Sequence, residues 1–375
     1  MSEIAEVLRA IESLSVRGER MALATIVGVQ GSTYRRPGAR LLVPEAGPMV
    51  GNISGGCLEG EVQAAARDVM DGGAPRLLTF DLTADDEAVW GWGLGCNGVI
   101  DVFVEPADRA AEVARTLRLA LEEDRPIAHV TVLESAAAGV RPGSHMVVHP
   151  GGRREGTLGS PDDDLAFTHE AERAIQDGLS QVVAITPEEG EIRAFVEVLE
   201  PPPRVLVCGA GHDTIPAVRH AASLGWRVTV ADDREAFLTA DRFPEAAGFV
   251  HTEPDRLGRA IELDRRTYVV VMTHNFLRDL GYLRSLLGTE VAYIGMLGPR
   301  ARLDRLLENL ARDGVHPSEE DLAKIHGPAG LDVGAEGPEE IAAAIVAEML
   351  AVQRGREAGF LRDRKGPIHG SSGER

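Results

Sequence analysis

The sequence predicts an α/β protein in which an N-terminal α+β domain is followed by a C-terminal Rossmann-like domain with a parallel sheet. Three observations predict this arrangement. Residues 204–232 follow the order strand, Gly-x-Gly turn, helix and strand with an acidic end, which is typical of half a Rossmann fold. Residues 4–199 mix helical periodicity with short strands and hairpin turns. Three consecutive prolines at residues 201–203 separate the two segments.

The predicted boundaries follow from these segments. A chain of 375 residues is long enough to form two cores. We expect a first domain over residues 1–199, a stiff linker over 200–203 and a second domain over 204–352. Residues 353–375 are predicted to form a flexible tail, because the end of the chain is polar and rich in glycine.

The composition restricts the classes of function. A formal net charge of −20 disfavours a phosphate backbone as partner, so no nucleic acid is expected. Three cysteines, an odd number in a long chain, favour a reducing compartment over a disulfide framework. No apolar run reaches the roughly 20 residues of a membrane helix, and the acidic start lacks the apolar core of a signal peptide. We therefore expect a cytoplasmic protein without stable membrane insertion.

The first domain is predicted from its periodicity. Apolar residues at helical spacing predict a helix over residues 4–14, and similar patterns follow residue 57 and span 107–123 and 165–178. The continuous apolar run at residues 21–29 predicts a buried strand. Further strands are expected at residues 39–43, 76–80, 99–104, 127–133, 146–149, 181–185 and 192–199.

Cys57 ends a glycine-rich turn and lies at the start of a predicted helix. Gly55 and Gly56 permit the turn, and the unpaired N–H groups and dipole of a helix N-terminus favour an anion, or a thiolate over a thiol. The stretch therefore predicts a loop that holds an anionic or sulfur-bearing ligand beside a reactive cysteine. The alternative is that Cys57 is a small buried hydrophobe and that the glycines only form a turn.

A second glycine-rich loop, at residues 91–98, carries Cys96. Its glycines, Gly95 among them, disfavour a helix and leave backbone N–H groups that can cradle a ligand. The alternative is a tight turn with a structural cysteine. Two cysteines embedded in glycine within one domain weaken that alternative.

Two arginines of the first domain have two interpretations, and its histidines are not expected to bind a metal. Arg35 and Arg36 are candidate clamps for a phosphate, although solvated surface charges are the commoner case. His145, His149 and His169 lie at spacings that do not resemble a metal site, so no protein-ligated structural metal is expected.

The second domain opens with strand 204–208 and the turn Gly209-x-Gly211. A helix follows, and the next strand, at residues 226–231, ends at Asp232, where a Rossmann fold binds a ribose hydroxyl. Thr214 occupies the position of the third glycine of the fingerprint, so the choice of dinucleotide does not follow. Cys208 lies inside the first strand and is predicted to belong to the core.

Later strands of this domain also end in residues that can bind a ligand or transfer a proton. The strand at residues 267–273 ends at His274, and the strand at 291–294 runs into a loop with Gly295 and Gly298 and then a basic helix. The carboxyl ends of parallel strands bind ligands, so these residues and His212 are expected to converge on one cleft. For each histidine alone, the alternative is a loop residue satisfied by solvent. A closing helix is expected over residues 341–352, capped by residues 336–340.

Several stretches together resemble the XdhC/CoxI family, accessory proteins of xanthine dehydrogenase and related molybdenum hydroxylases. The resemblance covers residues 5–352 in order. It is carried by GSTYRRPG at residues 31–38, SGGCLE at 54–59, GC at 95–96, GAGH at 209–212, TH at 273–274 with Asp279, YIGMLG at 293–298 and GLDVGAE at 330–336.

The resemblance implies a chaperone for molybdenum cofactor rather than a turnover enzyme. Family members bind this cofactor, protect it while a cysteine desulfurase installs its sulfido ligand, and pass it to an apo-hydroxylase of the xanthine or carbon monoxide dehydrogenase type. A homodimer is expected from the family. Cys57, Cys96 and His274 are then the candidates for contact with sulfur, molybdenum or protons. The candidates for holding the cofactor, in mononucleotide or dinucleotide form, are Arg35, Arg36, Gly55, Gly56, Glu59, Gly95, Gly209, Gly211, His212, Asp232, Gly295 and Gly298.

Two other hypotheses remain open. An NAD(P)-dependent oxidoreductase is suggested by the Rossmann half and by His274 as an acid or base, but the incomplete fingerprint and the cysteine loops do not favour it. A nucleotide-sensing module is the other alternative, and it leaves Cys57 without a task.

Overall fold

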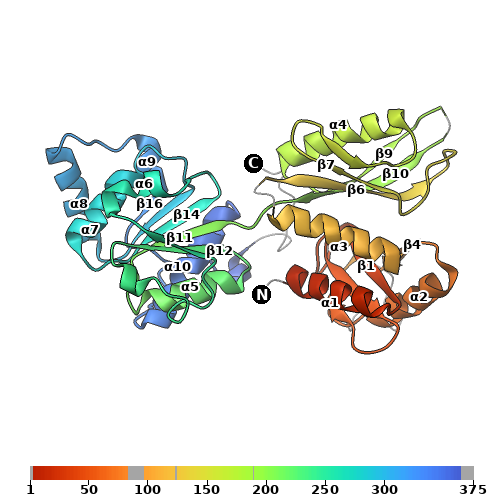
Figure 1. The fold of residues 1–375 in the computed structure, drawn as a ribbon, viewed down its shortest axis with the longest axis horizontal. Helices are drawn as coiled ribbons and strands as arrows, with labels where there is room; N and C mark the ends of the chain where they lie inside the picture. Colours follow the sequence, from red (N-terminus) through yellow and green to blue (C-terminus); the bar gives the residue numbers. More distant parts are fainter. Residues whose placement is uncertain (1–2, 83–96, 123–124, 189, 365–375) are drawn as a thin grey trace. The chain divides into compact units, whose positions relative to one another are not determined.

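The computed structural model describes residues 3–82, 97–122, 125–188 and 190–364 (Figure 1). The chain divides between two adjacent prolines into compact units, Glu3–Pro201 and Pro202–Arg364. Of the predicted tail, the residues up to 364 are described and include the 3-10 turn η3 (Leu361–Asp363); the remainder lies outside the described residues. No helix in the described ranges combines the length and the apolar character of a membrane span.

The first unit contains two five-stranded antiparallel sheets. The strand order is β3-β2-β1-β5-β4 in the first sheet and β8-β7-β6-β10-β9 in the second. The sequence pattern predicts the helices and strands, but the division into two sheets depends on pairing between distant strands. The strands are β1 (Met21–Ser32), β2 (Arg40–Pro44), β3 (Val50–Gly51), β4 (Arg76–Asp81), β5 (Asn97–Pro106), β6 (Ile127–Ser135), β7 (His145–Val148), β8 (Arg154–Gly156), β9 (Gln181–Ile185) and β10 (Ile192–Leu199).

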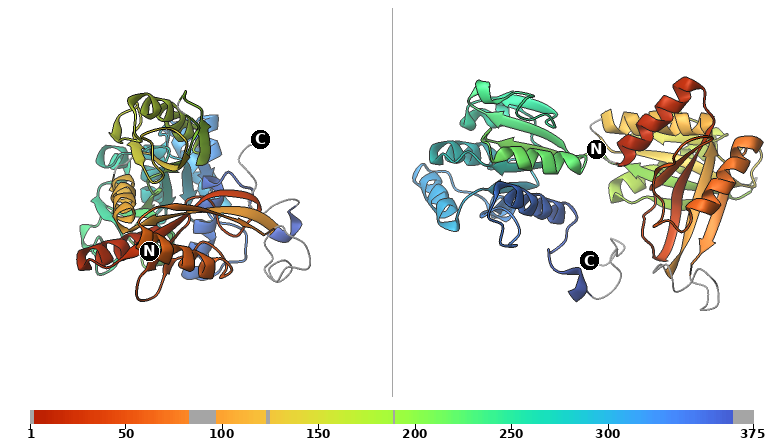
Figure 2. Two further views of the ribbon diagram at one scale, coloured as in Figure 1. Left: turned by 90° about the vertical axis from the view of Figure 1, so that its right-hand side faces the viewer. Right: turned by 90° about the horizontal axis from the view of Figure 1, so that it is seen from below.

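Four helices cover the faces of these sheets. Helix α2 (Glu59–Gly72) packs its apolar residues on one face of the first sheet. Helices α1 (Glu3–Arg17) and α3 (Ala107–Glu122) cover the opposite face, and their core also includes Ile127 of the second sheet. Helix α4 (Pro161–Asp177) packs on the far face of the second sheet. Helices α1 and α3 therefore lie on the face of the first sheet that also meets the second sheet, through Val27 and Phe103 (Figures 1 and 2).

Polar side chains also lie between the two sheets. Arg40 of β2 donates to Glu197 of β10 at 2.5 Å, and both side chains are almost fully buried. His129 of β6 is buried beside His145, with 5.3 Å between the ring centroids, and His145 contacts Glu112 of α3 at 2.7 Å. We call these five residues the inter-sheet cluster.

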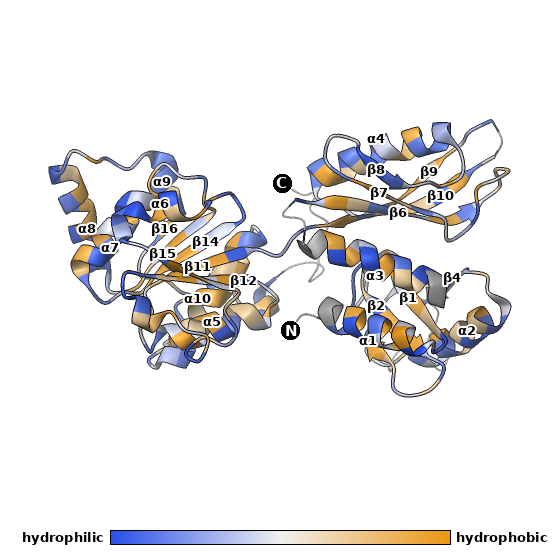
Figure 3. Ribbon diagram, in the orientation of Figure 1, coloured by the Kyte–Doolittle hydropathy of each residue, from blue (hydrophilic) through white to orange (hydrophobic). Residues whose placement is uncertain are grey.

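The second unit confirms the predicted Rossmann fold. Its sheet has the order β13-β12-β11-β14-β15-β16, with every pair parallel. The central strands are the most hydrophobic segments of the unit (Figure 3). The strands are β11 (Arg204–Cys208), β12 (Arg227–Asp232), β13 (Gly248–His251), β14 (Thr267–Val271), β15 (Tyr293–Met296) and β16 (Ile325–His326).

Helices cover both faces of the parallel sheet. Helices α5 (Thr214–Ser223) and α10 (Pro338–Gln353) pack on one face. Helices α6 (Leu257–Ala260), α7 (Phe276–Leu286) and α8 (Arg300–Arg312) pack on the other (Figures 1 and 2). The short helix α9 (Glu319–Lys324) precedes β16, and the turns η1 (Glu235–Phe237) and η2 (Pro254–Arg256) complete the unit.

Two strand ends differ from the predicted ranges in ways that affect the site. β14 ends at Val271 rather than at residue 273, so Thr273 and His274 both lie in the loop that follows it. β15 starts at Tyr293 and includes Gly295, which the sequence had placed in a loop. Apolar runs do not distinguish the last strand residue from the first loop residue, because both are buried at this edge.

Candidate functional site at the carboxyl edge of the parallel sheet

The strand order reverses between β11 and β14, and the loops after these strands therefore leave the sheet in opposite directions. In open α/β sheets such a switch point forms a crevice at the carboxyl edge where ligands bind. The loop after β11 holds residues 209–213, and the loop after β14 holds residues 272–275. The sequence correctly placed both segments next to each other.

Both glycines of the Gly-x-Gly turn lie close to an atom that a Cβ at the same position would meet. Gly209 has φ 113°, and a Cβ added there would lie 2.7 Å from the carbonyl oxygen of Met272. A Cβ on Gly211 would lie 2.6 Å from Asp213 Oδ1. A side chain at Gly209 would push the two loops apart, whereas a side chain at Gly211 would displace only the Asp213 side chain of the same loop.

The turn presents hydrogen-bond donors at the start of helix α5. Within the described part of the chain, the N–H groups of Gly211 and His212 donate to no acceptor, and the N-cap residue Asp213 makes no capping hydrogen bond. Thr214 is fully buried, and its Oγ1 likewise has no hydrogen-bond partner among the described residues. The N–H groups of the predicted candidates Gly211 and His212 can therefore receive an anion, whereas that of the third candidate, Gly209, donates to the carbonyl oxygen of Ala231 at 2.8 Å.

His274 has the backbone conformation that most strongly marks a functional position. Among the described residues it is the one non-glycine residue with positive φ, at 56°. Its Nε2 lies 2.6 Å from Oδ2 of Asp213, in the loop after β11. Left-handed backbone costs a non-glycine residue about 1–2 kcal/mol, and such strain is typical of active and binding sites. His274 and Asp213 thus form a pair across the crevice.

Replacing His274 by glycine is expected to cost the second unit about 1 kcal/mol less than the same change at His212, because glycine adopts positive φ without strain and this relief offsets the lost contact to Asp213. Urea unfolding measures the change. His212→Gly is the matched control: His212 lies in the neighbouring loop without positive φ, and glycine there should destabilise. Equal destabilisation by both substitutions would show that His274 is not strained.

A second pair, of Arg302 with the buried Asp279, orients an arginine toward a pocket that His274 also lines. Nε and Nη2 of Arg302, in the first turn of α8, donate to Oδ2 of Asp279 at 3.0 and 2.6 Å. Asp279 is almost fully buried, and its Oδ1 accepts from Thr273 Oγ1 at 2.5 Å. Gly298 has φ 119°, and a Cβ there would lie 2.8 Å from Cδ of Arg302. The arginine is therefore held in one orientation by residues of the β14 loop, the first turn of α7 and the β15 loop.

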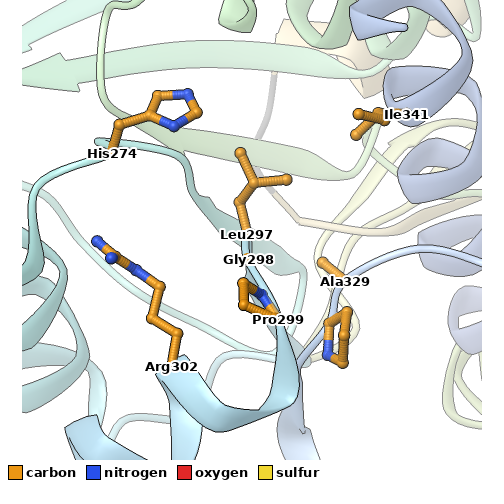
Figure 4. A pocket seen from close by; sticks show the side chains of 8 residues that line it. His274, Leu297, Gly298, Pro299, Arg302, Ala329 and Ile341 are labelled. Atoms are coloured by element: carbon orange, nitrogen blue, oxygen red, sulfur yellow. The ribbon is translucent and has the colours of Figure 1, made fainter. Parts of the chain in front are cut away.

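His274, Gly298 and Arg302 line a pocket with a volume of about 520 Å³ (Figure 4). Its polar side chains are those of His274, from the loop after β14, and Arg302, from the first turn of α8. The remaining wall is apolar or backbone and consists of Leu297, Gly298, Pro299, Pro328, Ala329 and Ile341. The pocket therefore combines an apolar wall with one guanidinium and one imidazole.

Asp232 does not offer a carboxylate to a ribose, as the sequence had suggested. Its Oδ2 accepts from the Ala210 N–H at 2.6 Å, and both oxygens accept from the guanidinium of Arg234 at 2.8 and 2.9 Å. Burial acts to raise its pKa, but these hydrogen bonds lower the pKa of Asp232 to about 2. In this structure Asp232 stabilises the Gly-x-Gly turn from behind.

Gly295 is also corrected. It lies inside β15 and is buried, and a Cβ there would lie 2.7 Å from the ring of Tyr293. The role of Gly295 is to make room for that ring rather than to contact a ligand. Tyr293 in turn donates to Glu348 of α10 at 2.5 Å.

The Cys57 loop differs from its prediction in its hydrogen bonds. Ser54 Oγ lies 3.2, 3.0 and 3.2 Å from the N–H groups of Gly56, Cys57 and Leu58 and accepts from them. Glu59 Oε1 accepts from the N–H of Ser54 at 3.0 Å, and Oε2 accepts from its hydroxyl. The prediction of unpaired N–H groups is therefore wrong, because the loop supplies its own acceptors. The SxxxxE spacing of Ser54 and Glu59 is a signal that could have shown this.

The remaining candidates of the first unit lie near this loop in sequence. Gly55 is exposed and Gly56 has φ 108°, so both permit the turn as predicted, and Cys57 is half-buried. Arg35 is half-buried and Arg36 is exposed, in the turn between β1 and β2. Gly95 and Cys96 lie outside the described residues. Burial raises the pKa of the Cys208 thiol well above its usual range, and its full burial confirms that it is a core residue.

Sequence reasoning missed two residues of the site. Asp213 follows GAGH directly, and Arg302 lies four residues after Gly298, in the basic helix that the sequence did predict. A search for charged residues within one helical turn of each glycine loop would have found both.

The chain is similar to known proteins over nearly its whole length. Residues 205–349 match the XdhC Rossmann domain, and residues 14–81 and 120–186 match the XdhC and CoxI family. A protein of Bacillus subtilis (strain 168) that is named as a probable xanthine dehydrogenase subunit is 29% identical over 344 residues, 92% of this chain and 96% of the relative. "Molybdenum cofactor insertion chaperone PaoD" of Escherichia coli (strain K12) is 22% identical over 348 residues, 93% of this chain and 88% of the relative.

A solved structure shares the fold. The crystal structure of a xanthine dehydrogenase from Bacillus halodurans superposes with a TM-score of 0.72 at 29% identity. The superposition covers 94% of this chain and 97% of the other.

Proposed function

The chain belongs to the XdhC and CoxI family, and on that premise we propose that it is a maturation factor for a molybdenum hydroxylase of the xanthine dehydrogenase type. It binds molybdenum cofactor, supports the sulfuration of that cofactor and delivers it to the apoenzyme. The relative named as a cofactor insertion chaperone supports this role, as does the relative named as a xanthine dehydrogenase subunit. In this proposal the protein is a chaperone and not a turnover enzyme.

The observation that carries the proposal is the crevice at the carboxyl edge of the parallel sheet, which fits the phosphate end of the cofactor. The N–H groups of Gly211 and His212 lack an acceptor in the described chain, and so does the buried hydroxyl of Thr214. Arg302 adds a guanidinium that is already oriented. A phosphate placed at this edge would satisfy donors that the protein leaves unpaired.

The sulfur end of the cofactor requires a thiol, and Cys57 is the candidate in the described residues. Cys208 is excluded because it is buried in the core and its thiol resists ionisation. Cys57 is half-buried in the turn that leads into α2, so its thiol is accessible from this loop. Cys96 stays a second candidate from the sequence.

The proposed partners follow from the same role. They are the apo molybdenum hydroxylase, a cysteine desulfurase that supplies the sulfur, and a second copy of the chain in a homodimer. A cytoplasmic location is part of the proposal, since client and desulfurase must meet the chaperone there.

Cofactor retention tests the proposal. Wild-type chain is mixed with released molybdenum cofactor, and molybdenum and pterin are counted after desalting. We expect wild type to retain both and Cys57→Ala to lose molybdenum on the order of ten-fold or more. Cys57→Ser is the matched variant, because it keeps the side-chain size and the loop hydrogen bonds while it removes the thiol.

The outcomes separate the hypotheses. Equal retention by wild type and both variants would remove Cys57 from the site and leave the crevice as the binding site. Failure of wild type to retain any cofactor would overturn the chaperone role. An NAD(P)-dependent oxidoreductase is the second candidate, supported by the Rossmann strand order and by the pair of His274 and Asp213. It predicts nicotinamide nucleotide binding instead.

A further inference from the structure

We propose that the pocket between the β14 and β15 loops and α10 is a binding site for a planar heterocycle that carries a phosphate, with Arg302 as the phosphate contact and His274 as the contact to the ring. The proposal deepens the proposed function and rests on it only where the ligand is the pterin cofactor. The same chemistry is shared by a nicotinamide nucleotide, and the experiment below distinguishes the two sources.

Arg302 is held in one orientation before a ligand binds. Both of its hydrogen bonds go to one oxygen of Asp279, a carboxylate that is buried and is held in turn by Thr273. A guanidinium has five N–H donors, so this pairing uses two and leaves three. Arg302 lines the pocket and its side chain is 26% exposed, so donors remain for a ligand. Asp279 is a positioning residue that removes the entropic cost of ordering the arginine.

The end of the pocket beside Arg302 favours a negatively charged group. Pro299, the N-cap of the 13-residue helix α8, and Gly298 line the pocket beside Arg302. The N-cap is a proline and the first turn of α8 contains no acidic residue, so the helix itself supplies no carboxylate to offset the positive end of its dipole. The helix end and the guanidinium act in the same direction. Both favour an anion, and the guanidinium fork matches two phosphate oxygens.

The apolar wall of the pocket receives the ring. Leu297, Pro328, Ala329 and Ile341 form a wall without side-chain polar groups, which suits the face of a flat heterocycle. His274 lies at the edge of this wall (Figure 4). Nε2 of His274 is paired with Oδ2 of Asp213 at 2.6 Å, so Nδ1 is the ring nitrogen left to contact a ligand. The strained backbone of His274 holds the ring there, and an N–H group of a pterin or a nicotinamide carboxamide can donate to it.

Binding to the full-length chain tests the proposal. The probes are released molybdenum cofactor, NAD+, NADP+ and inorganic phosphate, each titrated with calorimetry or by retention after desalting. We expect one heterocyclic phosphate to bind wild type, and Arg302→Gln to weaken it by about 10–100-fold, the loss of one or two hydrogen bonds to a charged group. His274→Asn tolerates the same backbone and should weaken the heterocycle several-fold but leave phosphate binding unchanged.

Two controls keep the result interpretable. Arg305→Gln removes an exposed arginine of the same helix that does not line the pocket, and it should bind as wild type does. Arg302→Lys keeps a positive charge opposite Asp279 and so protects the fold, but it loses the planar fork and should also weaken binding. Thermal unfolding of each variant identifies losses caused by misfolding.

The outcomes of the two proposals are distinct. Retention of molybdenum cofactor that is equal in wild type and Arg302→Gln would overturn the pocket proposal and leave the chaperone role intact. Binding of NADP+ or NAD+ that depends on Arg302, without retention of cofactor, would support the pocket and overturn the chaperone role. No binding of any heterocyclic probe to wild type at millimolar concentration would overturn the pocket proposal.

Discussion

Replacing Glu197 by alanine is expected to lower the free energy of unfolding of the first unit by about 3–5 kcal/mol. The side chains of Glu197 and its partner Arg40 are only 6% and 4% exposed, so the variant leaves a guanidinium charge inside the inter-sheet cluster. Arg40 would keep its hydrogen bond to the carbonyl oxygen of Gly38 at 2.7 Å, which does not replace the lost carboxylate. Urea unfolding of the full chain, with hydrogen exchange read on peptides from residues 3–201, measures the loss.

Two variants define what the loss means. Asp68→Ala breaks an exposed ion pair with Arg76 in the same unit and should leave stability nearly unchanged. The double variant Arg40→Met, Glu197→Leu removes both charges and should recover most of the stability, because apolar pairs of similar volume often match a buried ion pair. A single variant no worse than Asp68→Ala would show that the pair does not hold the sheets together.

This ion pair also illustrates what the sequence could not predict. The apolar runs of β2 and β10 identified both strands, but the two partners are 157 residues apart and lie in different sheets. Periodicity predicts which face of a strand is buried, not which strand lies opposite. The Rossmann half could be predicted in more detail, because its strand, glycine turn and helix are local in sequence and its strand order follows a general rule.

The candidate site shows the same division. Gly209, Gly211 and His274 were predicted as candidates because they lie within a few residues of a strand end, and strand ends can be located approximately from sequence. Asp232 and Gly295 were predicted to contact a ligand because their positions in the sequence fit the pattern. In the folded chain Asp232 accepts hydrogen bonds from Arg234 instead, and Gly295 packs against the ring of Tyr293. The pairs His274–Asp213 and Arg302–Asp279 join segments that are distant in the sequence, so only the folded chain brings them together.

Acidification below about pH 6.5 is expected to destabilise the first unit by up to about 1.4 kcal/mol per pH unit for each buried histidine that stays neutral. Burial lowers the pKa of His129 well below its usual range, and the charges of His145 and Arg40 lower it further. Burial also lowers the pKa of His145, although Glu112 acts in the opposite direction. The unfolded chain, with ordinary histidines, binds protons that the native state does not, so falling pH favours unfolding. Above pH 6.5 neither state binds them and the effect vanishes.

His129→Leu separates this effect from general acid unfolding. Nε2 of His129 has no hydrogen-bond partner among the described residues, so leucine costs no hydrogen bond at that atom and removes one titrating group. The dependence of unfolding free energy on pH between 6.5 and 5 should therefore be less steep in this variant. His169→Gln, on the exposed side of α4, is the control and should keep the wild-type slope. Equal slopes in all three proteins would exclude His129 as the group that takes up the proton. His145, beside Glu112, would then be the remaining histidine of the inter-sheet cluster.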